Sequence, residues 1–226
     1  MGEDNKAQTE TRQMLALVGE AISEWSFVEL SLCNLFTICL TPCSANPDSD
    51  QEAVVYVDFQ VPTAVFYSVE NFRSKLGMID AALCARIAGS NQRAVDVRDD
   101  WSKLREKIRK LSLKRNKLAH WTVTPAYYDI GISNPARLMP PYGSPGWWSE
   151  TGSRPAGKHL QPKQVDEIVR AFSLIDEKIR EFYKGFARDP ELTDKFDELT
   201  VRLIRLHDRR CPTRAERIRR DLASPE

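Results

Sequence analysis

The stretch PKQVDEIVRAFSLIDEKIREFYKGF, residues 162–186, carries the clearest structural pattern in this chain. Its apolar side chains recur at alternating intervals of three and four residues, at Val165, Ile168, Phe172, Ile175, Ile179, Phe182 and Phe186. These intervals place them on one face of an α-helix, because the helix turns once every 3.6 residues. Pro162 suits the first turn of a helix, where its missing N–H is not needed. The segment therefore predicts a long amphipathic helix whose apolar face other helices must cover.

The same spacing predicts helices in further segments, which cover residues 11–40, 62–88, 97–119 and 192–206. Residues 53–59 could instead form a short strand. We therefore predict an all-α fold, a bundle of four to five helices over residues 11–207. A flexible N-terminus at residues 1–10 precedes this domain, and an Arg-rich tail at residues 208–226 follows it.

A long insertion follows the third long helix, at about residues 121–160. It is rich in proline and aromatic side chains, and the prolines argue against a continuous helix. Residues 121–123 and 128–130 are predicted to pair as a short hairpin, and the rest is irregular. Segments of this length are often functional, so the insertion is a candidate lid, specificity element or part of a dimer interface.

The composition is that of a globular protein, with 226 residues, of which 42% are hydrophobic and 29% are charged. The net charge is only +1, so any surface that binds nucleic acid has to be local. No apolar run approaches the roughly 20 residues of a membrane span, and the first residues carry no signal-peptide core. We therefore expect a cytoplasmic protein that does not enter a membrane.

The cysteines and histidines predict neither a disulfide framework nor a metal site. Five cysteines are present, an odd number without a C-x-x-C pair. Cys33, Cys39 and Cys84 have apolar neighbours, and we expect them to be buried as small hydrophobic side chains. The three histidines lack the spacing of zinc ligands, so we predict no metal and no other cofactor.

Two charged residues of opposite sign fall on the apolar faces of predicted helices. In residues 97–119, the three–four pattern places Arg115 where the next apolar side chain is expected. In residues 11–40, the same pattern places Glu29 there. A lone buried charge costs several kcal/mol, so we predict that Glu29 contacts or orients Arg115. The alternative is a plain ion pair that only keeps two helices in register.

Arg115 also begins the motif Arg115-Asn116-Lys117-Leu118-Ala119-His120, at the end of a predicted helix. Asn116 and His120 are four residues apart, so they share one helix face. Histidine accepts or donates a proton near neutral pH, and arginine presents a planar fork that suits phosphate oxygens. These are the side chains that cleavage of RNA without a metal requires.

The pattern Arg115-Asn116-x-x-Ala119-His120 resembles the R-x(4–6)-H signature of the HEPN superfamily, which is often seen as R-N-x-x-A-H. HEPN domains are bundles of four or five helices with the signature near the end of an internal long helix, which agrees with the predicted layout. The opening helix, with Glu20, Glu24 and Trp25, is also similar to that of uncharacterised bacterial HEPN-like proteins.

The resemblance implies a metal-independent endoribonuclease that acts as a homodimer, with two signatures facing each other across one composite site. His120 would be the acid–base residue, Arg115 would bind or stabilise the scissile phosphate, and Asn116 would position either one. The products would be a 2′,3′-cyclic phosphate and a 5′-hydroxyl. The implied setting is toxin–antitoxin or phage defence, with an antitoxin or a defence-system protein as partner.

Side chains beside the motif are candidates for binding RNA. Lys114 and Lys117 belong to a basic run, and basic side chains bind phosphates without sequence preference. Tyr127, Tyr128, Trp147 and Trp148 could stack on unpaired bases, and Trp121, which directly follows His120, is a further candidate for contact with RNA. Solvated helix lysines and aromatic side chains packed on their own domain are the alternative interpretation.

Two other classes of protein stay open at this stage. A non-catalytic HEPN-like module would bind a nucleotide, RNA or a protein partner through the same surface. A plain helical scaffold would use Arg115 only in a buried ion pair and His120 only as a helix cap. The scaffold differs from the enzyme in predicting that His120 is buried away from any cleft.

Overall fold

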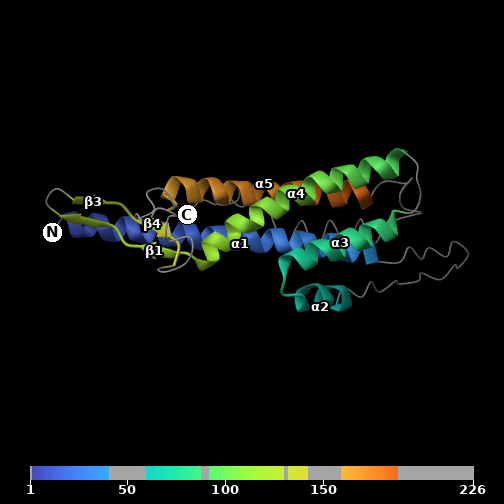
Figure 1. The fold of residues 1–226 in the computed structure, drawn as a ribbon, viewed down its shortest axis with the longest axis horizontal. Coiled ribbons are helices and arrows are strands. Elements are labelled where there is room, and N and C mark those ends of the chain that lie inside the picture. Colours follow the sequence, from blue (N-terminus) through green and yellow to red (C-terminus); the bar gives the residue numbers. More distant parts are fainter. Residues whose placement is uncertain (1, 41–59, 88–91, 130–131, 142–158, 188–226) are drawn as a thin grey trace, which may run out of the picture. The chain divides into compact units, whose positions relative to one another are not determined.

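The computed structural model describes residues 2–40, 60–87, 92–129, 132–141 and 159–187. Helices make up 83% of these residues, so the predicted all-α fold is confirmed. The helices are α1 (Gly2–Leu40), α2 (Gln60–Ser68), α3 (Phe72–Arg86), α4 (Gln92–His120) and α5 (Pro162–Ala187), as Figure 1 shows. Four short strands lie between α4 and α5: β1 (Thr122–Thr124), β2 (Tyr127–Asp129), β3 (Ile132–Asn134) and β4 (Arg137–Met139).

Two compact units share these elements, and each is described by itself. The ribbon unit, residues 1–26 and 110–172, holds the four strands with parts of α1, α4 and α5. The helix unit, residues 27–109 and 173–226, holds α2 and α3 with the remaining parts of those three helices. The motif therefore belongs to the ribbon unit, whereas Glu29 belongs to the helix unit.

One predicted helix is divided in two. Residues 62–88 were expected to form a single helix, but α2 ends at Ser68 and α3 begins at Phe72. The side-chain oxygen of Asn71 accepts a hydrogen bond from the Arg73 N–H at 2.8 Å, so Asn71 caps α3. In a continuous helix, the Arg73 N–H would donate to the carbonyl four residues earlier, whereas here the Asn71 side chain is its acceptor. The predicted strand at 53–59, the helix at 192–206 and the Arg-rich tail lie outside the described residues.

The core of the helix unit draws on all five helices. Its fully buried side chains include Leu32 of α1, Phe66 of α2, Ile79 of α3, Ile108 of α4 and Ile179 of α5. The predicted apolar faces of the helices over 97–119 and 162–186 are therefore confirmed where they enter this unit.

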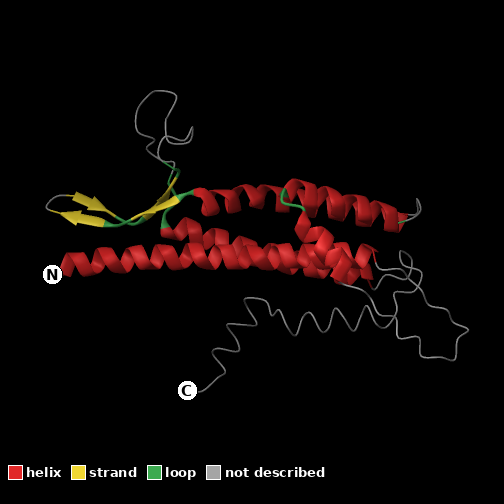
Figure 2. Cartoon of the chain, turned by 90° about the horizontal axis from the view of Figure 1, so that it is seen from below, coloured by secondary structure: helices red, strands yellow, loops and turns green. Residues whose placement is uncertain are grey.

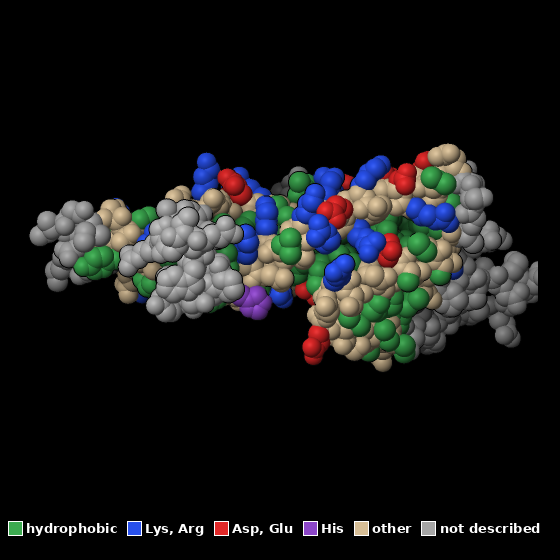
Figure 3. Space-filling view, viewed as in Figure 1, with side chains coloured by type: hydrophobic (Ala, Val, Ile, Leu, Met, Phe, Trp, Pro, Cys, Tyr) green, Lys and Arg blue, Asp and Glu red, His purple; other side chains and the backbone are tan. Residues whose placement is uncertain are grey.

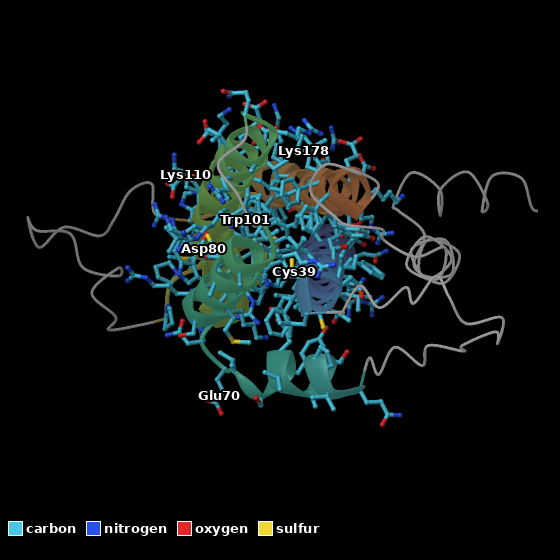
Figure 4. All side chains as sticks on the ribbon, turned by 90° about the vertical axis from the view of Figure 1, so that its right-hand side faces the viewer. Cys39, Glu70, Asp80, Trp101, Lys110 and Lys178 are labelled. Carbon is cyan, nitrogen blue, oxygen red and sulfur yellow. The ribbon has the colours of Figure 1, made fainter. Side chains whose placement is uncertain are left out.

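Polar groups at the edge of this core are also paired. The Trp101 indole N–H of α4 donates to a carboxylate oxygen of Asp80 of α3 at 3.0 Å (Figure 4). Arg105, one turn further along α4, donates to the other oxygen of the same carboxylate at 3.2 Å. Asp80 therefore ties α3 to two successive turns of α4.

An ion pair that the sequence analysis did not predict lies inside this core. Arg180 Nε donates to Oδ2 of Asp176, one turn earlier on α5, at 3.0 Å. Ser31 of α1 donates its hydroxyl to the other oxygen of Asp176 at 2.5 Å. The side chains of Arg180 and Asp176 are only 4% and 5% exposed. Because buried charges need such partners, the Ser31–Asp176 bond fixes α1 against α5 in this unit.

The cysteine predictions are correct for two residues and wrong for one. Cys33 and Cys39 are buried, and burial raises the pKa of the Cys39 thiol to about 12 (Figure 4). Cys84, however, is exposed. Its neighbour Leu83 takes the buried position on α3 instead, and residues next to each other on a helix face different directions.

The core of the ribbon unit is built from α1, α4, α5 and the strands. Its buried side chains include Met14, Ala21, Trp25, Leu118, Leu138, Val165, Val169 and Phe172. Trp25 and Phe172 meet edge to face, with ring centroids 4.9 Å apart. Leu15 was expected on the buried face of its helix, but it is 54% exposed, because the adjacent Met14 occupies that face.

The strand pairing differs from the prediction. Residues 121–123 and 128–130 were expected to pair with each other, yet β1 pairs with β4 and β2 pairs with β3. The two antiparallel pairs are nested, with Thr124 opposite Arg137 and Tyr127 opposite Asn134. Between them, Pro125-Ala126 and Pro135-Ala136 interrupt both sides of the ladder, because proline has no N–H to donate.

The first turns of α1 contact the strands β1–β4, which we call the ribbon. Figure 2 shows the start of α1 beside these strands. Tyr128 donates its hydroxyl to Glu10 at 2.5 Å, and the Lys6 ammonium lies 4.6 Å from the centre of the Tyr128 ring. The Ala126 N–H, next to the interrupting proline, donates to the Thr11 hydroxyl at 3.1 Å. These contacts hold Lys6, Glu10 and Thr11 against the strands. Because α1 begins at Gly2, the predicted helix start near Thr11 is wrong.

Candidate functional site

The motif occupies the last two turns of α4, as predicted. Helical hydrogen bonding continues to the end of the motif, where the Trp121 N–H donates to the Lys117 carbonyl at 2.9 Å. Helix geometry separates Arg115 from His120 by about 7.5 Å along the axis and by about 140° around it. Asn116 and His120 share one face of the helix. A ligand that contacts both His120 and Arg115 must therefore reach around the helix or meet a second chain.

Arg115 is half-buried, whereas Asn116 and His120 are exposed. Within the described residues of the ribbon unit, the buried Arg115 Nε–H has no hydrogen-bond acceptor and Arg115 forms no ion pair. The next residue on its apolar face, Leu118, is buried. The stem of Arg115 is therefore partly buried, while no carboxylate among the described residues of the ribbon unit forms an ion pair with its guanidinium.

The surroundings of the motif are basic. Residues 107–120 contain no aspartate or glutamate, and their cationic side chains are Lys107, Arg109, Lys110, Lys114, Arg115 and Lys117. Lys114 and Lys117 are exposed. Figure 3 shows lysine and arginine side chains gathered along α4. A locally positive helix end attracts phosphates even though the net charge of the chain is close to zero.

Trp147 and Trp148 lie outside the described residues, and the other three aromatic candidates differ in their surroundings. Trp121 directly follows His120, is half-buried, and has the Lys117 ammonium 5.4 Å from its ring centre. Tyr127 is 53% exposed. Tyr128 is hydrogen-bonded to Glu10, which raises the pKa of its phenol, and it holds the ribbon against α1. The geometry thus gives Tyr128 an anchoring role, whereas Trp121 lies beside the motif.

Glu29 has a partner that the sequence did not suggest. Its carboxylate forms an ion pair with the Lys75 ammonium of α3 at 2.9 Å, and the two side chains are 19% and 8% exposed. The same ammonium lies 5.0 Å and 5.2 Å from the ring centres of Phe66 and Tyr67 of α2. Lys75 thereby joins α1, α2 and α3 within the helix unit. Contact of Glu29 with Arg115, which belongs to the other unit, stays a prediction.

We expect Lys75→Met to lower the free energy of unfolding by about 1.5–3 kcal/mol, the range for hydrogen bonds to charged groups. Urea unfolding followed by circular dichroism measures this change. Lys103→Met is the matched control, because Lys103 pairs with Asp100 on the surface, where the two side chains are 71% and 66% exposed. The control is expected to change stability by less than about 0.5 kcal/mol. Equal effects of the two substitutions would contradict a structural role for the Glu29–Lys75 pair.

The described residues contain neither a cluster of metal ligands nor a helix that could span a membrane. No three His, Cys, Asp or Glu side chains there gather closely enough to hold a metal ion. None of the helices in these ranges is long and apolar enough to cross a membrane. Among the residues that sequence reasoning missed, Asp176 and Arg180 could have been found, because both interrupt the apolar face of α5 at helical spacing.

Comparisons with protein families, with characterised proteins and with solved structures find no match to this chain. We therefore infer function from the residues of the motif and from their surroundings in the ribbon unit.

Proposed function

We propose that this protein is a metal-independent endoribonuclease of the HEPN type, with Arg115, Asn116 and His120 as its catalytic residues. One observation carries the proposal. The exposed His120 and the half-buried Arg115, whose Nε–H has no acceptor among the described residues, share the last two turns of α4, which contain no acidic residue. A scaffold in which His120 serves only as a buried cap is not favoured by this exposure.

The chemistry follows from the roles of these side chains. The 2′-hydroxyl of the RNA attacks the adjacent phosphorus, and a histidine removes the hydroxyl proton as general base. A second proton donor protonates the departing 5′-oxygen, which breaks the P–O bond and leaves a 2′,3′-cyclic phosphate and a 5′-hydroxyl. Arg115 stabilises the negative charge that develops on the phosphate oxygens. Asn116, on the same helix face as His120, positions the imidazole or the phosphate.

The need for two proton-transferring groups favours a homodimer. Residues 115–120 contain a single histidine, His120, and histidine is the side chain most often used as a general acid or base. In a composite site, His120 of one protomer acts as base and His120 of the partner subunit acts as acid. The setting that we propose is toxin–antitoxin or phage defence, in which an antitoxin or another defence protein regulates the activity.

Cleavage of labelled RNA in the presence of EDTA tests this proposal. The wild-type protein is expected to cleave RNA to 2′,3′-cyclic phosphate ends and to leave the same sequence intact when it is made of DNA, which lacks the 2′-hydroxyl. Cleavage that requires added metal would contradict the mechanism. Binding of RNA without cleavage under all conditions would favour the alternative, a non-catalytic module that binds RNA, a nucleotide or a protein.

We expect Arg115→Ala to lower the rate of cleavage by about 10²–10³-fold, because removal of one preorganised donor to a developing negative charge has this effect. Single-turnover rates measure the change. Arg170→Ala is the matched control, since Arg170 belongs to the same unit but forms a surface ion pair with Asp166 on α5. Both substitutions replace an arginine by alanine. An equal loss of cleavage rate in both variants would therefore indicate a nonspecific effect of the lost positive charge.

A further inference from the structure

Trp121 is held in place next to the proposed acid–base residue. Its backbone N–H donates to the Lys117 carbonyl at 2.9 Å. The following residue, Thr122, pairs with Met139 in the β1–β4 ladder. The backbone of Trp121 is thus fixed by helix hydrogen bonding on one side and by strand pairing on the other. Its half-buried indole directly follows the exposed His120 in the chain.

Bound RNA could displace the Lys117 ammonium, which is the described neighbour over the Trp121 ring. The Lys117 ammonium lies 5.4 Å from the centre of the Trp121 ring, and Lys117 itself is exposed. An exposed cation–π contact is weak compared with stacking of a base on an aromatic side chain. A phosphate oxygen also offers the ammonium a stronger partner than the ring does. Bound RNA can therefore replace the Lys117–Trp121 contact with two stronger ones.

We propose that Trp121 is a stacking platform for one unpaired base beside the scissile phosphate, and that Lys117 turns from the ring to a phosphate of the same strand. The site then selects single-stranded RNA, because the bases of a duplex stack on one another and do not offer a free face to an indole. This inference rests on the proposed function for the position of the scissile phosphate. The stacking itself, however, can be tested without cleavage.

Binding is measured by fluorescence anisotropy with labelled RNA, in a His120→Ala background that prevents cleavage. The probes are a short single-stranded RNA and a duplex of the same length. Trp121→Ala is expected to weaken binding of the single strand by about 30-fold, the middle of the range for loss of one stacked base, and to change duplex binding by less than about twofold. Trp121→Phe keeps a ring and is expected to restore most of the affinity.

Two controls and one further variant make the result specific. Tyr67→Ala removes an exposed aromatic side chain of α2 in the other unit and is expected to leave both affinities unchanged. Lys117→Ala is expected to lower the dependence of log K on log salt by about one phosphate contact. Circular dichroism establishes that each variant is folded, and Trp121→Phe carries the test if Trp121→Ala does not fold.

Failure of this inference is distinguishable from failure of the proposed function. The stacking platform would be overturned if Trp121→Ala weakened the binding of single strand and duplex equally, or did not weaken binding at all. It would also be overturned if the parent protein, which carries only His120→Ala, did not bind RNA. If Trp121→Ala in an otherwise wild-type chain still cleaves single-stranded RNA at the full rate, the platform is wrong and the ribonuclease proposal stands. If the parent binds single strands through Trp121 but never cleaves, the platform stands and the ribonuclease proposal falls.

Discussion

His120→Ala is expected to lower the rate of RNA cleavage by about 10²–10⁴-fold, the usual contribution of a general acid or base. In a homodimer with a composite site, the substitution removes both the group that accepts the 2′-hydroxyl proton and the group that protonates the 5′-oxygen. The loss is therefore expected near the upper end of this range. Single-turnover cleavage of a labelled RNA in EDTA, quantified by gel electrophoresis, measures the rate.

His159→Ala is the matched control for this experiment. His159 also belongs to the ribbon unit and is partly exposed, but it lies outside the motif. Its substitution is expected to leave the cleavage rate within about twofold of wild type, an effect far below that of a lost acid–base group. A cleavage rate that survives His120→Ala, or that falls equally in both variants, would contradict the assignment of His120.

The largest expected effect on stability belongs to the buried ion pair of α5. Asp176→Ala leaves the 4%-exposed Arg180 guanidinium without its carboxylate, and breaking a buried pair in this way costs about 3–5 kcal/mol. The substitution also removes the acceptor of the Ser31 hydroxyl. Urea unfolding followed by circular dichroism and by tryptophan fluorescence measures the loss.

A second ion pair on the same helix is the control for Asp176→Ala. Asp166 and Arg170 have the same four-residue spacing, but the Arg170 side chain is 71% exposed, so Asp166→Ala is expected to cost no more than about 1 kcal/mol. The double substitution Asp176→Leu with Arg180→Met replaces both charges by apolar groups and is expected to recover most of the stability. If Asp176→Ala costs no more than Asp166→Ala, the buried pair is not important for folding.

Much of the helical architecture could be predicted because side-chain periodicity is a local property. The pattern over residues 162–186 predicted α5 almost to its ends, and the pattern over residues 97–119 predicted most of α4. The division between α2 and α3 was missed because the apolar spacing continues across Asn71, whose capping bond decides the boundary. The early start of α1 was missed because residues 2–10 have no apolar stripe and are instead tied to the ribbon through Glu10.

The strand partners could not be predicted, because pairing depends on which segments meet rather than on composition. Both segments of the expected hairpin are largely β-structure, but each pairs with a strand later in the chain. The symmetric Pro-Ala pairs at residues 125–126 and 135–136 are a signal that could have suggested one interrupted hairpin.

The candidate site was predictable in part. The position of Arg115, Asn116 and His120 at a helix end follows from sequence, since the motif directly precedes the proline-rich insertion. The Lys75 partner of Glu29 did not follow, because a lysine in the polar-looking sequence of α3 gives no sign that its ammonium is buried. Tertiary packing, rather than local pattern, brings that pair together.

The attachment of α1 to the strand ribbon has a practical consequence for the choice of protein fragments. A truncated chain that begins at Thr11, where the helical pattern becomes recognisable, would lose both Lys6 and Glu10 and with them the described contacts of Tyr128. Biochemical work on this protein is therefore best done with residues 2–10 retained.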